Sequence, residues 1–204
     1  TIEARIDSAY TNIFERAGSA GAFLDLDMEY WRLAPWVKYG VRDDLEVGVE
    51  VPLVNFSGGF LDGFIQRFHH FFHLPNGGRE TVPNGRFSYR FAAGGQTRFD
   101  FPSTELGLGD ITLHFKHQVT GEEKDLPAMA IFADIKFPTG KASRGWGSGL
   151  PDFGIGFAVE ANYRRLHGYF NGMYVAVGGS DQVSGYMRNA MFAFMVSGEL
   201  NLLP

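Results

Sequence analysis

Three histidines in the middle of the chain are the first residues that could bind a metal. His69 and His73 are four positions apart, which places both imidazoles on one face of a helix, as a two-histidine zinc site requires. Asp62 is a candidate for a further ligand, but no third ligand can be identified with it. We therefore predict no metal and no cofactor, and the histidine pair stays a hypothesis.

Nucleophilic and phosphate-binding chemistry have less support. The chain has no cysteine, which excludes disulfides, thiolate metal ligands and a cysteine nucleophile. His117 interrupts an apolar row, yet no serine lies two residues away and no G-x-S-x-G motif occurs, so a lipid hydrolase or acyltransferase is the third alternative. The segment Pro138–Lys141 lacks the spacing of a phosphate-binding loop. We predict that the protein is not an enzyme.

Many of the ionisable residues alternate with apolar residues, so they would line one face of a series of strands. Neighbouring strands would place opposite charges across from one another, which lowers the cost of enclosing them. The lining is then either a polar path or cavity for a small solute, or a closed, salt-bridged interior. The predicted lumen-lining residues are Arg32, Lys38, Arg42, Glu46, Glu50, His114, Lys116, Asp134, Lys136, Glu160 and Arg164.

The elements that position these residues are β-strands, because apolar and polar residues alternate with a period of two. We count roughly eight strands of about ten residues or more, the length that a tilted membrane strand needs. Phe23–Tyr30 alternates in the opposite phase to Trp31–Val41, and a β-bulge near Tyr30 would reconcile the two. The predicted strands lie near residues 2–14, 23–41, 45–53, 111–119, 129–137, 153–163, 168–178 and 189–201.

The connections between these strands sort by length. Alternate connections are short, and the others are longer, as in outer-membrane barrels, which have short periplasmic turns and long external loops. We treat residues 1–204 as a single domain, and because such barrels usually end on an aromatic strand, we expect it to be incomplete at its C-terminus. The short connections are 42–44, 120–126 and 165–167, and the longer ones are 16–22, 56–108, 139–150 and 179–188.

The composition favours a membrane barrel over a soluble one. The chain contains 27 glycines and 20 phenylalanines, and no apolar run approaches the roughly 18–20 residues of a spanning helix. The apolar rows carry few polar interruptions, and aromatic residues fall near strand ends, where interfacial girdles lie. A soluble, lipocalin-like barrel is the alternative. The aromatic residues are Trp31, Tyr39, Phe137, Phe153, Tyr163 and Tyr169.

These patterns also indicate a location and partners. The net charge is −5 and no basic run occurs, so nucleic acid is not an expected partner. We predict a protein of the bacterial outer membrane that contacts lipid or lipopolysaccharide and takes a small-molecule solute. The oligomeric state is left open.

The connection 56–108 is too long to be a passive hairpin loop. Phenylalanines and aliphatic residues recur at helical spacing between Phe60 and Phe72, and Pro75 with Gly77–Gly78 would end such a helix. We predict a short amphipathic helix that either folds into the lumen as a plug or gate, or lies on the outer leaflet.

Four glycine-containing motifs lie around the predicted loops: Gly107–Asp110, Lys136–Gly140, Gly147–Asp152 and Gly58–Gly63, the last followed by His69, Leu74-Pro75 and Gly78-Arg79. They resemble the motifs of an uncharacterised family, a domain of unknown function in Gram-negative outer-membrane β-barrels, akin to the putative barrels of the phenol meta-cleavage pathway. The resemblance implies a barrel of about twelve strands, with this chain similar to the N-terminal two-thirds of a typical member, and it implies no substrate.

Charged residues within these motifs have a predicted structural role. We expect Asp62, Arg79 and Asp152 to tie the long loop to the barrel rim through charge-assisted hydrogen bonds, with His69 and His73 on the same loop. The leading interpretation of function is an all-β, antiparallel, up-and-down transmembrane barrel that passes or binds a small solute. A structural or interaction barrel with a closed lumen is the second interpretation.

Overall fold

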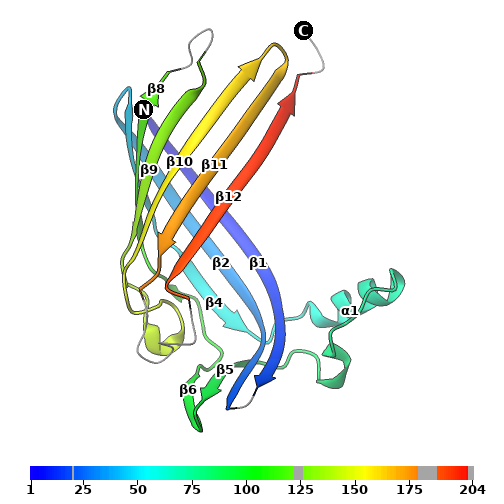
Figure 1. Ribbon diagram of the computed structural model, residues 1–204. Coiled ribbons are helices and arrows are strands. Elements are labelled where there is room, and N and C mark those ends of the chain that lie inside the picture. Colours follow the sequence, from blue (N-terminus) through cyan, green and yellow to red (C-terminus); the bar gives the residue numbers. More distant parts are fainter. Residues whose placement is uncertain (20, 122–125, 179–187, 202–204) are drawn as a thin grey trace.

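The computed structural model describes residues 1–19, 21–121, 126–178 and 188–201, and their fold is almost entirely antiparallel β-sheet (Figure 1). None of the helices in this part of the chain is long and apolar enough to cross a bilayer. The helices are α1 (Asp62–Phe71) and the single-turn helices η1 (Arg79–Thr81) and η2 (Ala142–Arg144). The strands are β1 (Ile2–Ser19), β2 (Ala22–Arg42), β3 (Leu45–Glu50), β4 (Leu53–Ser57), β5 (Ser88–Ala93), β6 (Gln96–Asp100), β7 (Gly107–Leu108), β8 (Thr112–Thr120), β9 (Ala128–Lys136), β10 (Asp152–Tyr163), β11 (Leu166–Ala176) and β12 (Ala190–Leu200).

The strands form one curled sheet, a half-barrel (Figure 1). Its order is β12-β11-β10-β9-β8-β3-β2-β4-β7, and β1 pairs with the other edge of β2. Because β3, β4 and β5 follow one another along the same edge of β2, they form one row. In the described part of the chain, this row and β1, β2, β8, β9, β10, β11 and β12 make eight rows. The sheet has twelve strands in this part, more than the roughly eight predicted, because one row is divided and the long loop adds further strands. Within the described residues, β1 and β12 are the outer edges.

The two faces of the sheet differ in polarity over most of its width. The inner face is the concave one, where Lys38, His114 and Asp134 from three strands line one cavity. The opposite, outer face carries large apolar side chains that stay exposed. They include Ile2, Ile6, Val37, Tyr39, Phe115, Ile131, Ile155, Phe157, Phe170, Tyr174, Phe192, Phe194 and Val196.

The polarity of the two faces inverts along β2. The pairing of β1 with β2 runs without a break from Ile2 opposite Tyr39 to Ser19 opposite Ala22, so the predicted β-bulge near Tyr30 is wrong. A register shift occurs instead at the far end of β2, between Gly40 and Arg42. The change of phase in the sequence therefore marks a change in the environment of each face, with no change in the strand.

An aromatic cluster on the inner face explains this inversion. Tyr30 stacks on Phe56 with ring centroids 5.1 Å apart, and Phe56 lies 5.3 Å from Tyr89. Tyr89 in turn lies 5.0 Å from Phe101, and Met28 is buried beneath them. At this end of β2 the inner face is thus a packed apolar core, and the charged residues of the strand point outward.

The connections partly match the prediction. Tight turns join β2 to β3 and β10 to β11 at one end of the sheet, and α1, η2 and the β5–β6 hairpin lie at the other (Figure 1). The expected loop 16–22 is wrong, because β1 continues to Ser19 and β2 begins at Ala22. The long loop contains the predicted helix and, in addition, β5, β6 and β7. The predicted connection 179–188 lies almost entirely outside the described residues, as does part of 120–126.

Candidate functional site

Charged side chains of opposite sign pair across neighbouring strands on the inner face, and we call this set the inner polar row. Lys38 Nζ lies 2.7 Å from a Glu46 carboxylate oxygen and 3.1 Å from Glu3 on the other neighbouring strand. Arg32 forms an ion pair with Glu50. These contacts follow from the register, in which the pairs Trp36–Glu50 and Gly40–Glu46 lie opposite each other.

The inner polar row continues into β8 and β9. His114 and Asp134 are direct cross-strand partners, and His114 Nδ1 lies 2.8 Å from Asp134 Oδ1. Further along the same face, Lys116 and Glu160 line a second cavity together with the small residues Ala130 and Ala158. Small side chains between charged ones leave space for water or a polar solute on the concave side.

At the end that carries the long loops, the row closes in a cluster around Asp110. Asp110 is buried and accepts hydrogen bonds from the Gly140 and Ser148 backbone N–H groups, each at 2.9 Å. Lys136 Nζ lies 3.3 Å from Asp110 and 2.5 Å from Asp152, and it donates to Ser148 Oγ at 2.8 Å. We call these residues the Asp110 cluster.

The Asp110 cluster explains three of the motifs on which the family resemblance depends. Asp110, Lys136–Gly140 and Gly147–Asp152 are separated in sequence and meet at this one point. A Cβ atom at Gly147 would overlap the Asp110 carboxylate, and one at Gly140 would overlap the backbone of Trp146. Glycine is therefore required at both positions for the loop to approach the carboxylate so closely.

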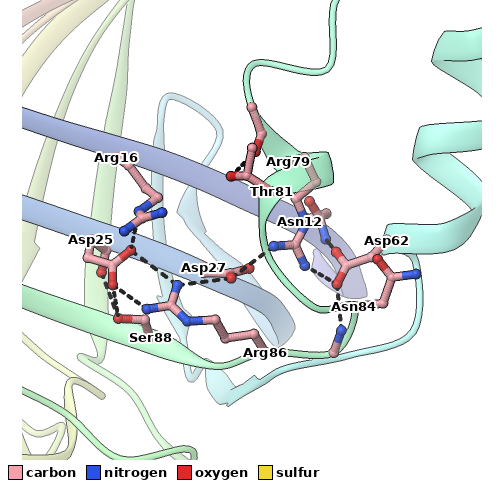
Figure 2. Close-up of polar contacts among 12 residues, drawn as sticks. Asn12, Arg16, Asp25, Asp27, Asp62, Arg79, Thr81, Asn84, Arg86 and Ser88 are labelled. Atoms are coloured by element: carbon pink, nitrogen blue, oxygen red, sulfur yellow. Dashed lines mark hydrogen bonds and ion pairs between the residues drawn. The ribbon is translucent and has the colours of Figure 1, made fainter.

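A second polar cluster lies on the outer face, where β1, β2 and the long loop meet (Figure 2). Arg79 bridges the carboxylates of two elements, Asp27 of β2 and Asp62 of α1. Its Nη1 lies 2.9 Å from Asp27, and its Nη2 bonds Asp62. Arg86 pairs with Asp25 and lies 3.1 Å from Asp27. We call this set the outer arginine cluster, and Arg16, 3.3 Å from Asp25, completes it.

Neighbouring donors lower the pKa values of two acids of this cluster, Asp25 and Asp62. The hydrogen bond from Arg86 lowers the pKa of Asp25 below its ordinary value, although burial acts in the opposite direction. For Asp62, burial alone would raise the pKa. Hydrogen bonds from the Gly85 backbone N–H, Arg79 and Asn12 together outweigh this contribution, and the net effect is a lowered pKa. The hydrogen bond to Asp25 raises the pKa of Arg86.

Glu29 attaches the start of α1 to the same face. Its side chain is fully buried, and it accepts hydrogen bonds from Tyr10 Oη and from the backbone N–H of Leu61. Asn12 Nδ2 donates to Asp62 at 2.9 Å. The long loop is thus bonded to both β1 and β2 on their outer side.

Nine of the predicted lining residues lie along the strands on the concave face, and the other two lie at turns. Arg42 lies at the β2–β3 turn, where it pairs with Asp44 at 3.1 Å and is exposed. Arg42 still lines a cavity with Lys38 and Glu46 at that end of the sheet. Arg164 lies in the β10–β11 turn with a positive φ of 56°. The nine residues are Arg32, Lys38, Glu46, Glu50, His114, Lys116, Asp134, Lys136 and Glu160.

The predicted loop and rim residues divide between the two clusters. Asp62 and Arg79 contact each other, as expected, whereas Asp152 lies apart from them and pairs with Lys136. The helical pairing of His69 with His73 is wrong, because α1 ends at Phe71 and His73 has a positive φ of 55°. His69 Nδ1 instead lies 3.0 Å from the Asn76 side-chain oxygen.

In the structure α1 does not fold onto the concave face as a plug. α1 is held by the outer face of β1 and β2 and points away from the sheet (Figure 1). His117, the candidate for lipid chemistry, lies on the outer face with its Nδ1 3.1 Å from the Asp44 backbone oxygen. Within the described residues, no group of three or more acidic or histidine side chains is arranged to hold a metal ion.

Sequence reasoning missed Asp25, Asp27, Glu29 and Arg86. The signal was present, because the three acids alternate with Leu24, Leu26 and Met28. The reversed phase of that segment was interpreted as a bulge, whereas it marks a charged outer face.

Fold and site together define a class: an antiparallel, curled all-β sheet with a charge-paired concave face and an apolar convex face. The chain belongs to the DUF3187 family, described as proteins of unknown function, whose model matches residues 1–196. No curated protein matches the chain. The expectation of an uncharacterised family is therefore confirmed, while the kinship with phenol-pathway barrels stays a prediction.

Proposed function

We propose that this protein is a β-barrel of the bacterial outer membrane whose concave face binds or passes a small polar solute. The observation that carries the proposal is the contrast between the two faces: ion pairs inside, and large exposed apolar side chains outside. Ile131, Ile155 and Phe194 are 52%, 63% and 80% exposed on the outer face. Lipid is the medium in which such a surface is stable, because exposed apolar patches of this extent are rare on soluble monomers.

The length of the apolar segment of β2 supports the proposal. From Trp31 to Val41 the outer-face positions are apolar, and before Trp31 they are acidic, at Asp25, Asp27 and Glu29. At about 3.3 Å per residue and a tilt of about 45°, this segment covers roughly 25 Å along the membrane normal, which is the height of an outer-membrane barrel's apolar band. The proposal also requires that the edges β1 and β12 be paired, since lipid tolerates no open sheet edge.

The concave face supports a path for small polar solutes. Lys116 and Glu160 face one cavity with the small residues Ala130 and Ala158 between them, and Lys38 and His114 face the next cavity. Paired charges along such a path lower the cost of enclosing them and leave polar groups that can replace part of a solute's hydration shell.

Ion selectivity in planar bilayers tests the proposal. The full-length protein should conduct, and Lys116→Glu should shift the reversal potential toward cations in a salt gradient. The matched control is Arg67→Glu, the same charge change at an exposed position of α1 outside the concave face. A reversal potential that shifts equally with both substitutions, or with neither of them, would contradict a path along the concave face.

A closed lumen is the second candidate, and the ion pairs themselves favour it. Lys38, Lys136 and Arg32 each bond at least one carboxylate, and fully paired charges can also fill an interior without leaving a path. Absence of conductance from protein that is folded and inserted would support this structural or interaction role over solute passage.

A further inference from the structure

We propose that α1 is a lateral membrane anchor, whose phenylalanine face enters the interfacial layer of the bilayer beside the sheet. The inference rests on the proposed function, because it takes the apolar outer band of the strands to face lipid. It adds a second lipid-binding element that lies outside the barrel wall.

The attachment of α1 fixes its height relative to the apolar band. Asp62, the first residue of α1, is 2% exposed and bonds Asn12 of β1, Arg79 and the Gly85 backbone N–H, the last at 2.7 Å. Leu61 bonds Glu29 of β2. Glu29 lies two residues before Trp31, where the apolar outer row of β2 begins. The helix therefore starts at the edge of the band.

The free part of α1 presents a row of unpartnered aromatic side chains. Figure 1 shows that the helix extends away from the sheet, so that no strand of the described residues covers the far side of the helix. Phe64 and Phe68 lie on one side of the helix with ring centroids 6.5 Å apart, and Phe68 lies 4.7 Å from Phe72. Phe60 and Phe71 are each 74% exposed.

The aromatic row is continuous with the outer face of the strands. The Phe60 ring lies 5.6 Å from the Tyr10 ring, and Tyr10 is the cross-strand partner of Trp31. Trp31 Nε1 donates to Ser8 Oγ at 3.1 Å on the same face. Tyrosine and tryptophan at the end of an apolar band are typical of a membrane interface, and Phe60 extends that girdle onto the helix.

The polar side of α1 suits the same position. Gln66 and His70 lie on the side of α1 away from Phe64 and Phe68, so the helix has one apolar and one hydrated side. Amphipathic helices of this kind lie in the plane of the interface with the apolar side about 5–10 Å deep. A lipid surface fits this geometry better than a second protein, because the row is level with the edge of the band that faces lipid.

Site-specific labelling tests the anchor. The chain has no cysteine, so Phe68→Cys and His70→Cys each give one site for an environment-sensitive dye, about 160° apart around α1. The full-length protein is inserted into phosphatidylcholine–phosphatidylglycerol vesicles. We expect dye at position 68 to shift to shorter wavelength and to lose intensity with lipids that carry a quencher near the headgroup, while dye at position 70 is quenched by aqueous iodide.

A third site separates the failure of the anchor from the failure of the proposed function. Ile131→Cys reports on the outer face at the middle of β9, and it is measured with lipids that carry the quencher on the acyl chain, because the site lies near the middle of the apolar band. Lipid quenching at 131 without quenching at 68 would overturn the anchor and leave the barrel intact. Absence of lipid quenching at 131 would overturn the proposed function, and the lateral anchor with it.

Discussion

At the scale of single residues, Arg79 is the clearest link between sequence-distant segments. It neutralises Asp27 and Asp62 in a buried environment, and its guanidinium also lies 4.9 Å from the centre of the Phe14 ring. We expect Arg79→Ala to destabilise the attachment of the long loop by up to about 3–5 kcal/mol, because it removes the ion-pair partner that two buried carboxylates share. Asp27 then keeps Arg86, and Asp62 keeps the donors of Asn12 and Gly85. Limited proteolysis between Phe71 and Arg86 and thermal unfolding measure the loss.

Arg67→Ala provides the control for this substitution, because Arg67 is exposed on α1. Equal protease resistance of Arg79→Ala and the unmodified protein would show that the outer arginine cluster does not hold the loop.

Gly147 is a residue at which only glycine leaves room for the buried carboxylate of Asp110. A Cβ atom at this position would overlap the carboxylate of Asp110, which accepts two backbone hydrogen bonds from the same loop. We expect Gly147→Ala to lower the free energy of unfolding by about 1–3 kcal/mol, the usual cost of forced overpacking. Gly168→Ala is the matched control, since its nearest neighbour would lie at an ordinary 3.8 Å. Denaturant titration measures the free energy of unfolding of both variants. If Gly147→Ala and Gly168→Ala lowered it equally, the expectation would be wrong.

At the scale of elements, β2 is the strand that joins the two environments. Its segment beyond Trp31 resembles a membrane strand, and its segment before Trp31 resembles a strand of a soluble sheet, with an aromatic core inside and acids outside. In the segment before Trp31 the acids lie on the outer face. The long loop can therefore bind them there and form the outer arginine cluster. A single continuous strand can therefore hold both a lining residue, Lys38, and a loop-binding residue, Asp27.

The loop attachment should depend on pH in one direction. Because the pKa values of Asp25 and Asp62 are lowered in the folded state, their contribution to stability is fully present above the ordinary pKa of about 3.9. It is lost as pH falls through their lower folded-state values. We expect hydrogen exchange in residues 58–87 to accelerate below about pH 4, once intrinsic exchange rates are taken into account.

The double variant Asp25→Asn and Asp62→Asn supplies the comparison. Its loop should exchange faster at neutral pH and should lose most of the acid dependence, since the titrating groups are gone. Protection that stays constant in the unmodified protein from pH 6 to pH 2 would contradict the role assigned to these carboxylates.

At the scale of the whole molecule, the outer face separates the membrane proposal from a soluble sheet. Ile131 lies opposite Phe157 near the middle of the apolar band and is 52% exposed. In a bilayer, Ile131→Arg should destabilise the folded state by about 2–4 kcal/mol, the cost of arginine near the midplane of a barrel. On a soluble protein the same exposed substitution would change stability by about 0.5 kcal/mol or less.

Ile131→Val serves as the control for size, and refolding into vesicles at graded denaturant measures each free energy. A negligible effect of Ile131→Arg in folded, vesicle-associated protein would place this face in water and would argue against the barrel.

The sequence by itself determined the class of fold. Period-2 alternation identified β1, β2, β3 and β8 to β12 and assigned their charged residues to one face, because the side-chain direction in a strand depends only on position. It did not identify β4 to β7. The helical spacing of phenylalanines identified α1 for a similar reason. These are local properties, and each needs only the residues within one element.

Only the tertiary structure decided what each face of β2 contacts. Alternation assigns a residue to a face but leaves open whether that face meets lipid, a packed core or another loop, and the reversed phase before Trp31 was therefore misinterpreted as a bulge. The contacts of Arg79 with Asp27 and of Asp110 with Ser148 join residues 52 and 38 positions apart. Such pairs depend on the register of several strands at once, which no local pattern in the chain specifies.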